Sequence, residues 1–106
     1  MSIQRARSVE EFVDFVEQAI FEVEELYMAA EYDMESMGAT RSFVKELETS
    51  LRDLKKAMQD GTYKFANKDL PYMEIVEAQN ERLLPFKYLL RQINETHRHG
   101  LDIGED

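Results

Sequence analysis

The longest regular pattern in the chain is a run of apolar residues at helical spacing that begins at Val9. Its members recur every three or four positions and meet no helix-breaking residue before Gly38. They are Val9, Phe12, Val13, Val16, Ala19, Ile20, Val23, Leu26, Tyr27, Ala30 and Met34. Ser8 and Glu11 form a capping-box pattern, in which each side chain satisfies a backbone donor at a helix start. The pattern predicts one amphipathic helix over residues 9–36.

A second apolar stripe follows the turn that we expect at Gly38. Its residues alternate in steps of three and four, as in the seam of a bundle helix, and they are Val44, Leu47, Leu51, Leu54 and Met58. Thr40 or Ser42 can cap the start of this helix, and Gly61 lies where a left-handed C-terminal cap is needed. These signals predict a second helix over residues 41–59.

Residues 60–70 have no helical periodicity, and a third apolar face begins after them. Pro71 is typical of a helix start, because proline lacks the N–H that the first turn leaves unpaired. The face comprises Tyr72, Met73, Val76, Leu83, Phe86, Leu89, Leu90, Ile93 and His97. Pro85 interrupts it, since the ring removes a backbone hydrogen bond. We expect either one kinked helix over 71–98 or two shorter helices meeting at Pro85, and a frayed tail over 100–106.

The helix lengths favour an all-α fold in which a single domain spans residues 1–106. The first and third predicted helices each reach about 42 Å, whereas the second reaches about 28 Å. An antiparallel up-down-up three-helix bundle, with the third helix kinked or split at Pro85, fits these lengths if the 60–70 connection crosses the gap. Tyr63 and Phe65 would then cover the seam between the first and third helices that the second leaves open.

The composition of the 106-residue chain is acidic, with a net charge of −9. Proteins that bind nucleic acids or anionic lipids normally carry a surplus of Lys and Arg. The negative net charge therefore disfavours direct binding to either. Cysteine is absent, which excludes thiolate catalysis and thiolate metal ligands. No apolar stretch is long enough to span a bilayer, and no signal-peptide-like segment follows Arg5 and Arg7. We therefore expect a cytoplasmic protein.

Charge is concentrated at the first predicted helix. Residues 9–37 contain ten acidic side chains and no Lys or Arg, whereas residues 40–99 contain 11 basic and 9 acidic side chains. Two interpretations stay open. Either the other helices neutralise this charge along shared edges, or the carboxylates form a surface that docks a basic partner or imitates a nucleic-acid backbone. Metal binding by these carboxylates is a third and weaker alternative.

Phe21 and Met28 are apolar residues that the main stripe of the first helix does not explain. They are seven positions apart, so they lie almost above one another, about 140° from the centre of that stripe. Glu17, Glu24 and Glu25 flank them, which gives an apolar centre with a charged rim, a composition found at partner surfaces. These five residues are the candidate partner-binding site. Isolated exposure and burial by a further segment are the alternatives.

The titratable residues form no pattern that predicts catalysis, a cofactor or a bound metal. The sequence has no Glu-x-x-His pair for a di-iron bundle, no Gly-x-Ser-x-Gly elbow and no glycine-rich phosphate loop. His97 and His99 lie about 200° apart on a helix, so they cannot share a metal there. We expect His97 to be half-buried near a helix C-terminus, where an imidazolium ion suits the helix dipole.

These observations predict a non-enzymatic, cytoplasmic protein-interaction module, an adaptor or regulator that uses the acidic face of the first helix. Its expected partner is a protein with a basic or apolar surface, or a second copy of the chain. The alternative is a helical bundle that binds a small molecule or a metal in a pocket near Pro85, beneath Tyr63 and Phe65.

Overall fold

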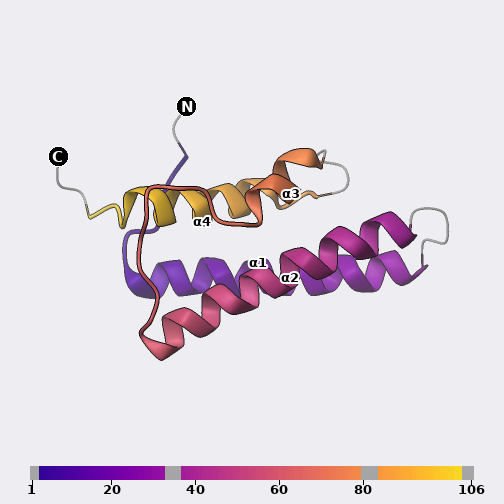
Figure 1. Ribbon diagram of the computed structural model, residues 1–106, viewed down its shortest axis with the longest axis horizontal. Helices are drawn as coiled ribbons and strands as arrows, with labels where there is room; N and C mark the ends of the chain where they lie inside the picture. Colours follow the sequence, from indigo (N-terminus) through magenta and orange to yellow (C-terminus); the bar gives the residue numbers. More distant parts are fainter. Residues whose placement is uncertain (1–2, 33–36, 80–83, 104–106) are drawn as a thin grey trace.

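The chain folds into four helices in the computed structural model, which describes residues 3–32, 37–79 and 84–103. The helices are α1 (Val9–Tyr32), α2 (Met37–Asp60), α3 (Met73–Ala78) and α4 (Lys87–His99). Figure 1 shows α1 and α2 as an antiparallel pair, with α3 and α4 lying along one side of it. The predicted all-α fold is confirmed, whereas the arrangement as a three-helix bundle is not. None of the helices within these ranges is long and apolar enough to cross a bilayer.

The start of α1 confirms the predicted capping pair. The backbone N–H of Glu11 donates to Ser8 Oγ at 3.0 Å. The Glu11 carboxylate accepts a hydrogen bond from the backbone N–H of Arg7 at 3.2 Å, one residue before the position that a capping box uses. The helix is described as far as Tyr32, and the predicted last residues, 33–36, lie outside the described part of the chain.

The second helix starts earlier than predicted and ends as predicted. Residues 37–40 are helical, so the turn expected at Gly38 is wrong. A glycine inside a helix costs only about 1 kcal/mol relative to alanine, which packing of a long amphipathic helix offsets. At the other end Gly61 has a φ of +75°, and the Gly61 and Thr62 N–H groups donate to the carbonyls of Met58 and Ala57. This is the left-handed cap that the sequence indicated.

The predicted third helix over 71–98 is two helices, α3 and α4. The break begins at Gln79, whose backbone is extended, with φ −98° and ψ 146°. Pro85 lies in the turn before α4 and explains where that helix can begin, but it does not end α3. The Gln79 carbonyl is satisfied by the Lys87 ammonium group at 2.8 Å. Leu83, which the prediction placed on the same face, lies outside the described residues.

The core lies where the apolar faces of the helices meet, and α1 packs against both α2 and α4. Fully buried side chains come from every helix and from the residues just before α3 and α4, and they include Phe12, Val16, Val23, Leu47, Leu51, Tyr72, Val76, Leu84, Leu90 and Ile93. The Tyr72 hydroxyl donates to the Leu90 carbonyl at 2.7 Å, so this phenol is buried with its polar end satisfied. The core therefore joins the α1–α2 pair to the later half of the chain.

Two non-helical segments hold the C-terminal half of α4 from opposite sides. On one side, the Ala6 N–H donates to Thr96 Oγ1 at 2.9 Å in a buried hydrogen bond, and the Asp102 N–H donates to the Ala6 carbonyl at 2.8 Å. On the other side, the Ala66 N–H donates to the His97 carbonyl at 3.2 Å. The Ala66 hydrogen bond holds the 61–72 connection beside α4, where the connection helps to form the cavity described below.

Candidate functional site

The candidate partner-binding residues lie on one exposed surface of α1. The side chains of Phe21 and Met28 are 55% and 50% exposed, and Glu25 is exposed beside them. We call Phe21, Met28, Glu17, Glu24 and Glu25 the α1 face. Two large apolar side chains are therefore exposed on the same surface of this helix.

Two carboxylates of the α1 face are paired with α2. Glu24 Oε1 lies 3.5 Å from an Arg52 guanidinium nitrogen, and Glu17 Oε2 lies 4.0 Å from Lys55 Nζ. Both pairs are solvent-exposed, so each contributes at most about 1 kcal/mol to stability. The idea that neighbouring helices neutralise the acidic helix therefore holds for the edge that faces α2. It does not apply to Glu25, for which the described residues provide no ion pair.

The 61–72 connection carries a small aromatic cluster onto α1. The Phe12 ring centroid lies 5.8 Å from that of Tyr63 and 5.9 Å from that of Phe65, and the Tyr63 and Phe65 centroids are 5.3 Å apart. These separations are typical of favourable aromatic pairs. Phe65 nevertheless stays 45% exposed, so it forms the outer edge of the cluster rather than a closed cover.

Tyr63 and His97 form a polar pair between the connection and α4. The Tyr63 oxygen lies 2.6 Å from His97 Nδ1, and the His97 side chain is only 7% exposed. Burial raises the pKa of the Tyr63 hydroxyl above its usual value. Burial, and secondly the nearby Lys68 ammonium group, lower the pKa of His97 below 6.5. His97 lies in the last turn of α4 as expected but is buried rather than half-buried, and this burial, together with the nearby lysine, disfavours the imidazolium form.

We expect His97 to titrate below pH 6.5 in the folded protein, and Lys68→Gln to shift its midpoint upward. Below about pH 6.5 the unfolded chain then binds more protons at this histidine than the folded chain does. His97 therefore lowers the free energy of unfolding as the pH falls below about 6.5 and has no such effect at higher pH. NMR titration of the His97 Cε1 proton measures the midpoint. Lys56→Gln, on the exposed side of α2, is the control. A midpoint at or above 6.5 in the parent would contradict the burial seen here.

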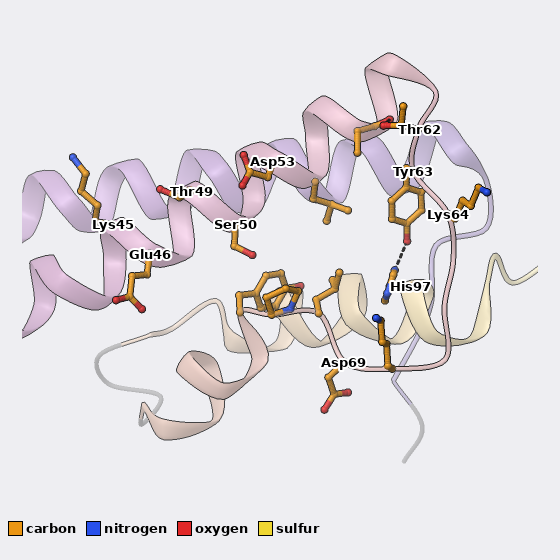
Figure 2. A pocket seen from close by; sticks show the side chains of 16 residues that line it. Lys45, Glu46, Thr49, Ser50, Asp53, Thr62, Tyr63, Lys64, Asp69 and His97 are labelled. Atoms are coloured by element: carbon orange, nitrogen blue, oxygen red, sulfur yellow. Dashed lines mark hydrogen bonds between the residues drawn. The ribbon is translucent and has the colours of Figure 1, made fainter.

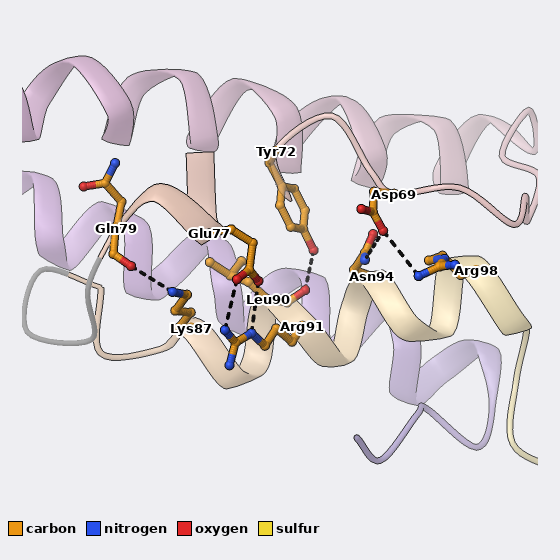
Figure 3. A network of polar contacts seen from close by, with 9 residues as sticks. All are labelled: Asp69, Tyr72, Glu77, Gln79, Lys87, Leu90, Arg91, Asn94 and Arg98. Carbon is orange, nitrogen blue, oxygen red and sulfur yellow. Dashed lines mark hydrogen bonds and ion pairs between the residues drawn. The ribbon is translucent and has the colours of Figure 1, made fainter. Parts of the chain in front are cut away.

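A second polar network surrounds Asn94 on α4 (Figure 3). The buried Leu70 N–H donates to Asn94 Oδ1 at 2.8 Å, and Asn94 Nδ2 donates to Asp69 Oδ1 at 3.0 Å. Arg98 lies 3.6 Å from the same Asp69 oxygen. No motif in the sequence predicted this network. The available signal is that Asn94, four residues after Leu90 and next to Ile93, places a polar side chain on the apolar face of the helix.

Figure 3 also shows the ion pair between Glu77 of α3 and Arg91 of α4. Arg91 makes two hydrogen bonds to the Glu77 carboxylate, both at 3.2 Å. The hydrogen bonds from Arg91 lower the pKa of Glu77, and they outweigh its slight desolvation, which acts in the opposite direction. Because both side chains are substantially exposed, we regard this pair as setting the position of α3 rather than as a major contribution to stability.

A cavity of about 780 Å³ lies between α2 and the 61–72 connection, with His97 at one end (Figure 2). A smaller one, of about 400 Å³, lies along the start of α3. The larger cavity does not lie at Pro85, where we expected a ligand pocket. Tyr63 lines this cavity, whereas Phe65 and Pro85 do not. The difference arises because Tyr63 turns its hydroxyl toward His97, while Phe65 lies on Phe12 instead.

No group of three or more metal-ligating side chains occurs among the described residues. No protein-family model matches the sequence, and no curated protein or solved structure shows significant similarity to it. Among the described residues, the α1 face and the cavity beside Tyr63 and His97 are the two candidate sites.

Proposed function

We propose that the protein is a non-enzymatic interaction module of the cytoplasm, an adaptor or regulator that binds another protein through the α1 face. The observation that supports this proposal is the exposure of Phe21 and Met28 together on a helix without a single basic residue. A large apolar side chain surrounded by charged ones is the composition of an interface core and rim, in which the apolar residue supplies most of the binding free energy.

The charge of α1 decides which kind of partner fits. Contact between the α1 faces of two copies would bring carboxylates against carboxylates, which costs binding free energy. A partner with an apolar centre and a rim of Lys or Arg meets no such cost, and its charges would complement the exposed Glu25. We therefore favour a basic protein surface over a second copy of the chain.

Phe21→Glu is expected to weaken binding of a basic partner about tenfold or more, although it adds a negative charge, because the apolar centre is lost. The probe is a fluorescent amphipathic helical peptide made of leucine and lysine, followed by anisotropy. Tyr88→Glu is the matched control: Tyr88 is 54% exposed on α4 and the substitution changes the net charge equally.

The controls distinguish contact from simple charge attraction. If the peptide is held only by long-range electrostatics, both variants bind as tightly as the parent or more tightly, and the α1 face is not the site. Sedimentation velocity of the parent, run first, shows whether the chain self-associates. A dimer that persists in Phe21→Glu would place the dimer contact elsewhere, and a dimer that is lost would make a second copy the partner.

A further inference from the structure

The cavity beside α2 is independent of the α1 face and has the size of a small-molecule site. Its volume of about 780 Å³ lies within the range of about 300–1,000 Å³ that ligand pockets occupy. One wall is α2, and the opposite wall is the connection that runs from Thr62 to Tyr72. Figure 2 shows this wall crossing from the end of α2 to α4, so that the space is bounded on two sides and open between them.

The middle of the cavity is apolar. Leu54, Leu70 and Tyr72 form the floor of the cavity and are almost fully covered by the core. Ala57 and Pro71, which are less buried, present apolar surface to the open space. An apolar chain or ring lying here would exchange water for contact with these side chains, which is favourable in proportion to the area covered.

One end of the cavity carries cations and hydrogen-bond donors. Lys68 lines it close enough to His97 to lower the pKa of that histidine. Lys64 also belongs to the lining, but Figure 2 shows its ammonium group directed away from His97. In the tautomer in which the Tyr63 hydroxyl donates to His97 Nδ1, the neutral imidazole carries its own proton on Nε2, and the described residues provide no acceptor for it. The ammonium group of Lys68 near this ring favours an anionic group at this end.

The carboxylates of the cavity lie away from this end or are already paired. Figure 2 shows Glu46 beside Lys45 at the opposite end, and Asp53 on the α2 wall. Asp69 is held by hydrogen bonding to Asn94 and by its ion pair with Arg98. The positive end therefore has no carboxylate of its own directed at the His97 ring.

We propose that this cavity binds an amphipathic organic anion, an apolar chain or ring system that ends in a single acidic head such as a carboxylate. The apolar body lies against Ala57 and Pro71, above the floor formed by Leu54, Leu70 and Tyr72. The head lies at the end formed by Lys68 and the Tyr63–His97 pair. Because neither the residues nor the wall overlap with the α1 face, this site and the proposed protein contact can be tested separately.

The test is a titration of the protein with decanoate, kept below its micelle-forming range and followed by two-dimensional amide NMR. We expect saturable shifts that are largest at residues of the two cavity walls, such as Ser50, Leu54 and Leu70. Decan-1-ol, which has the same chain without the charge, is expected to bind about tenfold more weakly. Equal affinity for the two compounds, or shifts spread over the whole chain, would overturn the proposal.

Variants locate the head and the body of the ligand. Lys68→Gln is expected to weaken decanoate binding about fivefold or more, and Thr49→Trp, which fills the cavity from an exposed α2 position, to abolish it. Lys56→Gln removes the same charge from α2 outside the cavity and leaves binding unchanged. Phe21→Glu also leaves decanoate binding unchanged, so a failure of the protein contact does not affect this result.

Circular dichroism confirms that each variant is folded. Equal loss in Lys68→Gln and Lys56→Gln, or undiminished binding by folded Thr49→Trp, would contradict the assigned site.

Discussion

Phe12→Ala is expected to lower the free energy of unfolding by about 3–5 kcal/mol, the cost of removing a buried phenylalanine. Phe12 is 1% exposed and lies at the centre of the aromatic cluster, in contact with Tyr63 and Phe65. Truncation leaves a cavity beneath the 61–72 connection. Because this connection is not helical, we expect it to fill the cavity only partly. Urea unfolding followed by circular dichroism measures the effect, and we expect the melting temperature to fall by about 12 °C or more.

Phe65→Ala is the matched comparison, because it removes the same ring from the outer edge of the same cluster. With the ring 45% exposed, the expected loss is about 1–2 kcal/mol, clearly smaller than that of Phe12→Ala. Equal losses in the two variants would contradict the exposure of Phe65 and indicate that the connection closes more tightly than described.

Asn94→Leu is expected to lower the free energy of unfolding by about 2–3 kcal/mol, although leucine keeps the branched shape of the side chain. The substitution leaves the buried Leu70 N–H without its acceptor and removes the hydrogen bond to Asp69. The loss of the buried acceptor dominates, because the Asp69 carboxylate is largely exposed and can turn to water. Urea unfolding measures the total change, and hydrogen exchange at the Leu70 amide reports the local one.

Asn67→Ala serves as the control for Asn94→Leu. Asn67 lies on the same connection and accepts a hydrogen bond from Arg98 at 3.3 Å, but it is exposed. Its replacement is expected to change stability by no more than about 0.5 kcal/mol. A Leu70 amide that exchanges as slowly in Asn94→Leu as in the parent would show that another acceptor replaces the asparagine.

The features that the sequence predicted correctly are those set by neighbouring residues. The apolar stripe of α1, the Ser8–Glu11 cap and the left-handed Gly61 each depend on side chains within one or two helical turns. The exposure of Phe21 and Met28 also followed from helical geometry alone, because their angle placed them away from the stripe.

The features that it did not predict depend on contacts between distant segments. Gly38 is an exception, because the turn that the glycine predicts is replaced by helical residues 37–40 and this difference needs no distant contact to explain it. The end of α3 at Gln79 involves Lys87 from the next helix. The cavity was expected at Pro85 because proline is the visible irregularity. Its real position follows from Tyr63 bonding to His97, a pair separated by 34 residues that no spacing rule identifies.

The attachment of the N-terminal segment to α4 sets an order for folding. The hydrogen bond from Ala6 to Thr96 joins residues 90 positions apart, so closing this loop costs more chain entropy than pairing the neighbouring α1 and α2. The α1–α2 hairpin can form first, with α4 docking afterwards. During synthesis, the side of α1 that α4 will cover stays in water until α4 has been made. A chain interrupted before that point exposes this surface and is prone to aggregate.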